Sequence, residues 1–161
     1  MNQRRQFSET MLDVMESNPH VCVLLGDIGV FAFREHMARW PMRCINAGVS
    51  EQGMVGMAAG MAASGLYPVI HTIDSFLARR AYEFLRLDFG EQNLPGLFVS
   101  VGHDRDYAAL GPSHHCPEGH DLIQCIPNML VVEPANANAV DIAIRGAIDN
   151  QMLAYIRMRD N

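Results

Sequence analysis

Glu51 is the residue whose setting points most directly to chemistry. It follows a polar turn, Asn46 to Ser50, and opens a stretch of small and apolar residues that runs to Gly60. A helix with so few charges is typical of a buried helix, and burying a carboxylate costs free energy unless it is paired or hydrogen-bonded. We therefore expect Glu51 to have a partner, within this chain or outside it. The simpler alternative is a helix cap, with Ser50 as the N-cap residue and the carboxylate stabilised by the helix dipole.

Histidines gather in a second candidate region, the segment 102–117, which is rich in Gly, His and Asp. His103 stands in Gly-His-Asp and His114 in Gly-Pro-Ser-His-His. A histidine can donate to a developing alkoxide or move a proton near neutral pH, although a loop histidine can equally be a plain surface residue. The segment 114–121 holds several potential metal ligands, but no second ligand pair stands out, so no metal site is expected.

The hydrophobic pattern alternates between short apolar runs and helical periods. Strands are expected at 21–25, 43–46, 67–71, 97–101, 129–132 and 153–156, and helices at 6–17, 31–39, 51–64, 75–89 and 136–149. This alternation predicts an α/β fold with three layers, a doubly wound and mainly parallel sheet with helices on both faces. In such sheets ligands bind beyond the carboxyl ends of the strands. Asp27, Glu51 and the segment 102–117 fall at those ends.

Composition excludes several classes of protein. The 161 residues suit one domain, 1–161, with 49% hydrophobic and 19% charged residues. A net charge of −6 and the lack of a Lys/Arg run argue against nucleic-acid binding. No apolar run reaches the roughly 18 residues of a membrane span, and the N-terminus is unlike a signal peptide. The four cysteines show neither disulfide nor zinc spacing, so we expect reduced thiols in a cytoplasmic protein.

Several motifs in the chain resemble those of one known family. They are Asn46 to Gly60, Asp74 to Glu83, Asn93-Leu94-Pro95, Gly111-Pro112-Ser113-His114-His115, Ile126 to Met129 and Pro134-Ala135-Asn136. In this order they resemble the pyrimidine-binding domain of transketolase-like, thiamine-diphosphate-dependent enzymes. Each motif alone is weak, but the ordered set covers nearly the whole chain. The resemblance implies the thiamine-diphosphate-binding fold.

The resemblance implies roles for four residues beside the cofactor. The glutamate that matches Glu51 hydrogen-bonds a ring nitrogen of the aminopyrimidine, and so promotes removal of the thiazolium proton. Phe76 matches the aromatic region that stacks on the aminopyrimidine, Asp27 an acidic position near the active site, and Arg79 a helix position beside it. The alternatives are a core phenylalanine for Phe76, a turn residue for Asp27 and a solvated charge for Arg79.

Three further residues match substrate contacts of the family. His114 matches the histidine that meets the oxygen atoms of the substrate, and His103 resembles a second such histidine. Arg5 matches an N-terminal arginine of the phosphate-binding group. The implied reaction is transfer of a two-carbon ketol unit from a ketose donor, by a transketolase-like transferase.

The family holds the diphosphate and the metal ion with another domain, and its pattern is missing here. Gly26-Asp27-Ile28-Gly29 lies on the wrong strand for it, and we expect the C-terminal transketolase domain to be absent from this chain as well. We therefore expect the small subunit of a split enzyme. A larger partner subunit would hold the diphosphate and Mg²⁺ or Ca²⁺, as a heterotetramer that binds thiamine diphosphate between the chains.

Departures from the family concern the acceptor substrate. Leu110 replaces an acidic residue, Glu133 an arginine and Phe31 a serine of the phosphate site, while Gly119 and Gln124 replace charged residues. An anion in place of a cation disfavours phosphate binding. The acceptor is therefore expected not to be an ordinary aldose phosphate, but a carrier-bound or unphosphorylated compound.

Other functions stay open from the sequence. The chain can be a beta-type component of a 2-oxo acid decarboxylase or dehydrogenase, because the cofactor chemistry is shared. It can be a non-catalytic scaffolding subunit, although such a subunit has no need of Glu51. A stand-alone α/β binding protein would bind its ligand without a partner chain.

Overall fold

A six-stranded sheet forms the middle layer of the computed structural model, which describes residues 2–160. The strands are β1 (Val21–Leu25), β2 (Cys44–Asn46), β3 (Tyr67–Ile73), β4 (Gly96–Val101), β5 (Leu130–Val132) and β6 (Leu153–Met158). Their order is β2-β1-β3-β4-β6-β5, and every neighbouring pair is parallel. The central strands are almost wholly buried, as the continuous apolar runs require in a sheet covered on both faces.

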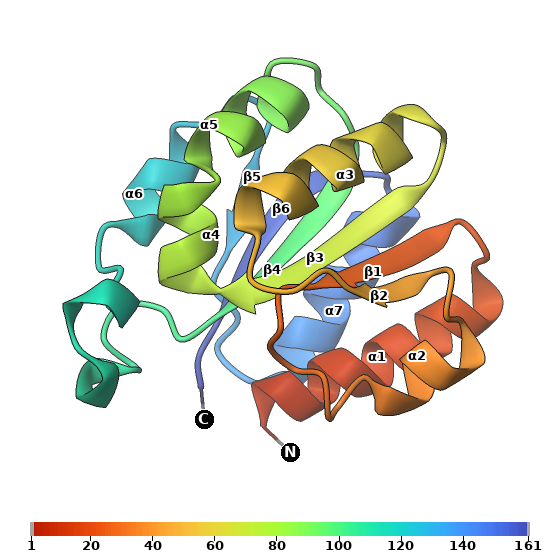
Figure 1. Ribbon diagram of the computed structural model, residues 1–161, viewed down its shortest axis with the longest axis horizontal. Coiled ribbons are helices and arrows are strands. Elements are labelled where there is room, and N and C mark those ends of the chain that lie inside the picture. The colour runs from red at the N-terminus through yellow and green to blue at the C-terminus, as the bar shows by residue number, and fades with distance from the viewer. Residues whose placement is uncertain (1, 161) are drawn as a thin grey trace.

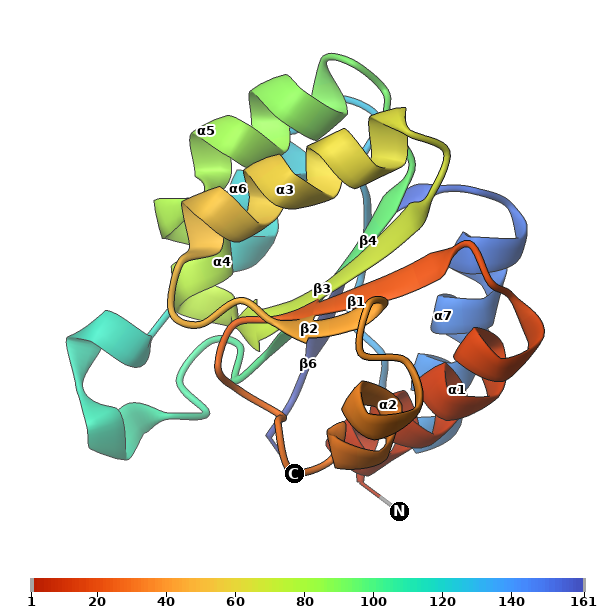
Figure 2. The ribbon, with the colours of Figure 1, turned by 45° about the vertical axis from the view of Figure 1, so that its right-hand side comes forward.

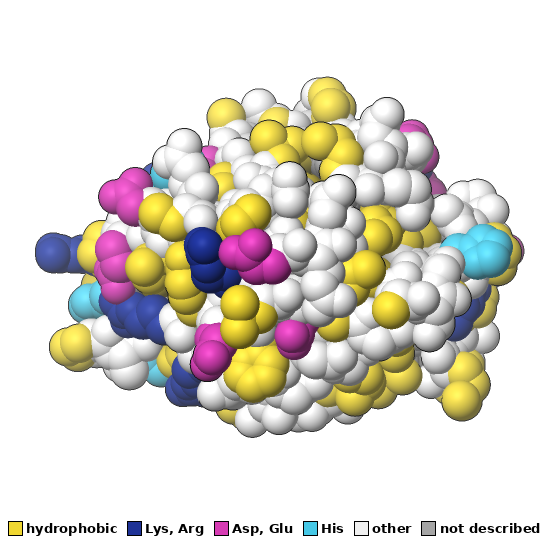
Figure 3. Space-filling view, turned by 90° about the horizontal axis from the view of Figure 1, so that it is seen from above, with side chains coloured by type: hydrophobic (Ala, Val, Ile, Leu, Met, Phe, Trp, Pro, Cys, Tyr) yellow, Lys and Arg dark blue, Asp and Glu magenta, His cyan; other side chains and the backbone are white. Residues whose placement is uncertain are grey.

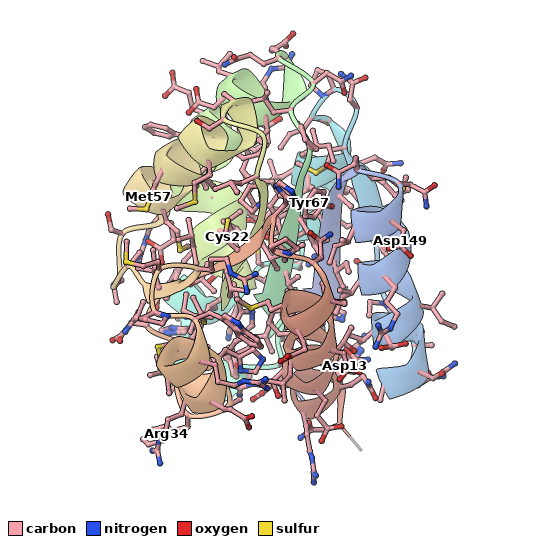
Figure 4. The ribbon with its side chains drawn as sticks, turned by 90° about the vertical axis from the view of Figure 1, so that its right-hand side faces the viewer. Asp13, Cys22, Arg34, Met57, Tyr67 and Asp149 are labelled. Carbon is pink, nitrogen blue, oxygen red and sulfur yellow. The ribbon has the colours of Figure 1, made fainter. Side chains whose placement is uncertain are left out.

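Helices cover both faces of this sheet (Figures 1 and 2). One face carries α1 (Gln3–Ser17), α2 (Arg34–Arg39) and α7 (Ala137–Asp149), and the other α3 (Glu51–Ala63), α4 (Asp74–Arg80), α5 (Tyr82–Phe84) and α6 (Gly119–Gln124). Each face has its own apolar core. Figure 4 shows Cys22 and Tyr67 in the interior, and Met57 on the outer side of α3. The predicted three-layer fold is confirmed. Within the described residues, no helix has the length and apolar character to cross a membrane.

The predicted helix 75–89 is wrong as a single element. It breaks at Ala81 into α4 and α5, and continues as a π-helical turn, η1 (Leu85–Gly90). In the wider turn Phe89 packs edge-to-face on Phe98, with ring centroids 4.9 Å apart. Gly90 approaches Ile126 so closely that an added Cβ would lie 2.6 Å from its Cγ2 atom. Tertiary packing therefore overrides the regular helical period here.

Smaller boundary differences have local causes. Helix α1 begins at Gln3 rather than at residue 6, because the Asn2 side chain accepts a hydrogen bond from the backbone N–H of Arg5 at 2.9 Å. Helix α2 begins at Arg34 rather than at residue 31, after a turn. Helix α6 was not predicted; it follows a loop of two short 3₁₀ turns.

The carboxyl ends of the strands share one edge of the sheet, because all neighbouring strands are parallel. Asp27 after β1 and Asp104 after β4 adopt positive φ values of 58° and 56°, which are uncommon for residues other than glycine. The loop 102–118 projects from this edge in Figure 1. Three other residues with positive φ, Asn93, Asn128 and Gln151, lie in the loops that enter β4, β5 and β6 at the opposite edge, so backbone conformation alone does not single out a site.

Candidate functional site

Glu51 is the first residue of α3 and is only 1% exposed. Ser50 takes the N-cap position, but its side chain makes no capping hydrogen bond. Arg80 Nη1 donates to Glu51 Oε2 at 3.2 Å. The other oxygen, Oε1, is buried and has no hydrogen-bond partner within residues 2–160. The carboxylate thus has the partner that its burial requires, but only for one oxygen, and the second can accept another donor.

An aromatic ring and a histidine lie beside this carboxylate. Phe76, on α4, is half-buried, and the guanidinium carbon of Arg80 lies 3.9 Å from its ring centroid. The His114 ring contacts Phe76 at a centroid distance of 4.9 Å and an interplanar angle of 64°. Residues from α3, α4 and the loop after β4 therefore form one cluster. We call Glu51, Phe76, Arg80 and His114 the Glu51 cluster.

Arg80 is the member of this cluster that the sequence did not predict. Phe76 and Arg80 are four residues apart on α4, so they share one face of the helix. That spacing was the available signal. The neighbouring Arg79 instead donates from Nε to Glu118 Oε1 at 2.7 Å. A cofactor contact by Arg79 stays a prediction.

Asp27 and His103 lie at the same edge of the sheet with partners of their own. Asp27 exchanges two hydrogen bonds with Asn46, at 3.1 and 3.0 Å. His103 is 3% exposed, and its Nδ1 lies 3.1 Å from Asp104 Oδ2 without hydrogen-bond geometry. His114 Nδ1 lies 3.0 Å from the hydroxyl of Ser113. The roles of Asp27, His103 and His114 stay predictions.

A buried ionic network anchors the elements that carry the Glu51 cluster. Arg157 on β6 and Asp74, the first residue of α4, have side chains 1% and 0% exposed, with Arg157 Nη2 2.9 Å from Asp74 Oδ2. Arg157 also donates to the carbonyl of Cys116 at 3.1 Å and pairs with Glu133. Burial opposes its charge, but these carboxylates raise the pKa of Arg157 above its usual value. A lone arginine in an apolar strand was the signal for this network.

A pocket of about 490 Å³ lies between the start of α1 and the turn before α2. Arg4, Arg5 and Phe31 are among its lining residues. Arg5 and Phe31 are the two positions that the sequence assigned to the phosphate site, and the structure brings them together. Arg4 Nη1 lies 2.7 Å from Asp160 Oδ1, and Arg5 Nε donates to Glu9 Oε1 at 2.8 Å. Both arginines therefore already face a carboxylate. Within residues 2–160 no group of three His, Cys, Asp or Glu side chains is placed to hold a metal ion.

The chain is similar to several known proteins. An uncharacterized 33.6 kDa protein of the Rhodococcoides fascians fasciation locus is 32% identical over 152 residues, which are 94% of this chain and 49% of that protein. A putative transketolase C-terminal section of Methanocaldococcus jannaschii is 29% identical, over 96% of this chain and 49% of that protein. A 1-deoxy-D-xylulose-5-phosphate synthase of Syntrophus aciditrophicus is 32% identical, over 88% of this chain and 22% of that protein. The chain thus spans about half the length of the first two relatives.

Solved structures and a family comparison agree with this likeness. A split gene transketolase, in an inactive beta4 tetramer, superposes with a TM-score of 0.86 at 26% identity, over 99% of this chain and 51% of that chain. Transketolase of Campylobacter jejuni superposes with a TM-score of 0.88, over 100% of this chain and 26% of that chain; at 16% identity this is a likeness of fold. The family described as transketolase, pyrimidine binding domain, matches residues 1–160. Since that match extends over nearly the whole sequence, the chain belongs to the transketolase pyrimidine-binding domain family.

Proposed function

We propose that this chain is the pyrimidine-binding subunit of a split thiamine-diphosphate-dependent enzyme that transfers a two-carbon ketol unit. The observation that carries the proposal is Glu51, a buried carboxylate at the start of α3 with one oxygen unpartnered within the described residues. An unsatisfied buried oxygen costs free energy, and such groups are retained where a ligand satisfies them.

The Glu51 cluster fits the aminopyrimidine of the cofactor. Glu51 would form a hydrogen bond with a ring nitrogen and hold the proton there, while the half-buried face of Phe76 would stack on the ring. Thiamine diphosphate, when bound, supplies a nucleophilic carbon that attacks the carbonyl group of a substrate. The contribution of this chain is to orient the ring, to exclude water and to place a carboxylate against it.

The surroundings of Phe76 favour a ketose as the donor substrate. His114 contacts that ring and is half-buried, so a ring nitrogen of its imidazole would hydrogen-bond the hydroxyl and carbonyl oxygens of a sugar. Its Nδ1 is next to the Ser113 hydroxyl, which leaves Nε2 as the atom for substrate contact. His103 is proposed as a second substrate histidine on the same loop.

The acceptor is proposed to lack the usual phosphate contact. The arginines of the pocket near α1 are paired with Asp160 and Glu9. Glu133, at a position where the family has an arginine, is engaged by Arg157 and by His120. A phosphate would have to compete with these carboxylates, which supports an unphosphorylated or carrier-bound acceptor.

A larger chain is proposed to hold the diphosphate and its Mg²⁺ or Ca²⁺, with two copies of each chain in a heterotetramer. Support comes from the split gene and C-terminal-section relatives. Hydrophobic side chains also lie on the face that Figure 3 shows, and three of them are well exposed: Met57 on α3, Phe84 on α5 and Leu87 on η1, at 45%, 37% and 48%. An apolar face of this kind suits a permanent subunit interface.

Glu51→Gln in the reconstituted two-chain enzyme tests the proposal. The substitution keeps the size of the side chain but removes its ability to hold a proton, so we expect turnover to fall about 10²-fold or more. Glu16→Gln, an exposed change at the end of α1, is the matched control and should leave turnover unchanged. Undiminished turnover of Glu51→Gln would favour a scaffolding role. Turnover of a 2-oxo acid in place of a ketose would favour the decarboxylase alternative.

A further inference from the structure

Arg80 presents to Glu51 the same chemistry that an aminopyrimidine would. Its guanidinium is a flat, delocalised group that lies 3.9 Å above the Phe76 ring and donates an N–H to Glu51 Oε2 at 3.2 Å. An aminopyrimidine is also flat, stacks on aromatic rings, and carries an amidine-like edge of ring nitrogen and amino group. The carboxylate of Glu51 accepts an N–H from the guanidinium, and it would bind a ring nitrogen of the pyrimidine through a proton held between the two atoms, so both planar groups use the same oxygen atoms.

We propose that Arg80 fills the aminopyrimidine subsite of the cofactor-free chain and must swing out before the cofactor binds. This inference rests on the proposed function, because it takes the Glu51 cluster to be the aminopyrimidine subsite. It adds a conformational step, and it assigns to Arg80 the role of an internal competitor.

Burial explains why the subsite has such an occupant. The Glu51 side chain is 2% exposed, and a buried carboxylate without a cation is strongly unfavourable. The Arg80 side chain is 44% exposed, so its guanidinium can reach Glu51 from one side and return to solvent without repacking of the core. Glu51 is therefore compensated before the cofactor arrives and can exchange one planar partner for another.

Arg79 gives the comparison within the same helix. It carries the same charge one residue earlier, but it pairs with Glu118 at 2.7 Å; within residues 2–160 it makes no hydrogen bond or ion pair with Glu51 and no cation–π contact with Phe76. Removing Arg79 thus removes a positive charge near the site without emptying the subsite. The two adjacent arginines form a matched pair of variants.

Competition by Arg80 lowers the affinity of the subsite for the cofactor. The apparent affinity equals the intrinsic affinity multiplied by the fraction of time for which the subsite is empty. If Arg80 occupies the subsite about nine-tenths of the time, its removal raises the apparent affinity about tenfold. This tenfold change in affinity corresponds to about 1.4 kcal/mol. This is within the range of a charge-assisted hydrogen bond of a half-exposed group.

The test uses the full chain without its partner, and calorimetric titration with 4-amino-5-(hydroxymethyl)-2-methylpyrimidine, the pyrimidine part of the cofactor. We expect Arg80→Ala to bind this probe about tenfold more tightly than the unmodified chain, and Arg79→Ala to bind it as the unmodified chain does. The gain should disappear in the double variant Arg80→Ala, Glu51→Gln. Arg80→Gln serves as a second variant that keeps most of the side-chain volume.

A second probe separates this inference from the proposed function. Methylguanidinium at millimolar concentration should raise the melting temperature of Arg80→Ala but not of the unmodified chain, since it replaces the missing group at Glu51. Equal or weaker binding of both probes by Arg80→Ala overturns the inference. If Glu51→Gln leaves turnover of the assembled enzyme intact while methylguanidinium still protects Arg80→Ala, the proposed function fails and the occupancy by Arg80 stands.

Discussion

Two arginine–carboxylate pairs lie at opposite ends of helix α4 and differ in how completely their polar atoms are satisfied. At its first residue, Asp74 accepts hydrogen bonds from Ser100 at 2.7 Å, Tyr155 at 3.1 Å and Arg157 at 2.9 Å. At its last residue, Arg80 reaches Glu51 with one donor, and Glu51 Oε1 is left without a partner within residues 2–160. The first pair is closed and the second is open.

We propose that the difference separates a structural pair from a functional one. Both carboxylates are buried, so both would be costly if unpaired. A saturated pair has no capacity for a ligand, and its value lies in fixing β6, α4 and the Cys116 loop relative to one another. An unsaturated pair with a half-exposed cation keeps the capacity for an outside partner. Helix α4 is thus held at one end and available for exchange at the other.

The largest effect is expected from opening the closed pair. Arg157→Met leaves the buried Asp74 and the exposed Glu133 without their cation, and the uncompensated charge of Asp74 should lower the free energy of unfolding by about 3–5 kcal/mol. Urea unfolding of the isolated chain measures this loss. Arg145→Met, which removes surface ion pairs with Asp13 and Asp141, should cost less than about 1 kcal/mol. Equal losses in the two variants would contradict a special structural role for Arg157.

His71 is a second buried polar residue with its hydrogen bond formed inside the protein, and its contribution to the free energy of unfolding depends on pH. Burial lowers the pKa of His71 from 6.5 to about 4, although its hydrogen bond to the Val99 carbonyl, 2.7 Å long, acts in the opposite direction. Between these two values the unfolded chain binds more protons than the folded chain. The stability contributed by neutral His71 is therefore present above about pH 6.5 and is lost as the pH falls toward 4.

His71→Gln should flatten this dependence. Between about pH 7 and about pH 4.5, we expect the fall in unfolding free energy to shrink by about 2 kcal/mol relative to the unmodified chain. Burial also lowers the pKa of His36, which gives a residual slope of the same sign in both proteins. Denaturant titrations at a series of pH values measure the difference. An unchanged slope would mean that His71 is not held neutral by its surroundings.

Most of the fold follows from patterns that are local in sequence. Apolar runs such as 21–25 and 97–101 are long enough for buried strands. Their alternation with helices favours a parallel sheet, because the helices then cover the apolar faces of the strands on both sides. The burial of Glu51 was predictable for the same reason, since the helix behind it has almost no charged face. The π-helical turn at η1 was not predictable, because it depends on how Phe89 and Gly90 meet β4 and Ile126.

The individual residues of the candidate site were predictable from the sequence, but the contacts between them were not. Glu51, Phe76 and His114 lie in sequence motifs that can be recognised locally. The contact between Glu51 and Arg80, however, joins residues 29 positions apart on two different helices. Two adjacent arginines on α4 look alike in sequence, and only the packing of α3 against α4 distinguishes their partners. The Arg157 network is likewise non-local, since Asp74 lies 83 positions away from Arg157.

A smaller effect is expected from crowding the closed pair without removing it. A Cβ added at Gly119 would lie 2.9 Å from Arg157 Nη2 and from Asp74 Oδ2, and 3.0 Å from Cys116 Sγ. Gly119→Ala should therefore cost about 1–2 kcal/mol in thermal or urea unfolding, despite the better helix propensity of alanine. Gly60→Ala on α3 meets open space and should stabilise the isolated chain by about 0.5–1 kcal/mol. Stabilisation by both substitutions would show that the network tolerates displacement.

The smallest effect is expected from neutralising the open pair. Glu51→Gln removes a buried charge and the cost of its unpartnered Oε1, but it also loses a charge-assisted hydrogen bond from Arg80. These contributions oppose each other, so the unfolding free energy of the isolated chain should change by less than about 1 kcal/mol. Asp74→Asn, an equally small change at the closed pair, should cost several times more. Because the same Glu51→Gln substitution is expected to remove most of the turnover of the assembled enzyme, a large loss of stability here would place Glu51 with the structural carboxylates and break the distinction between the two ends of α4.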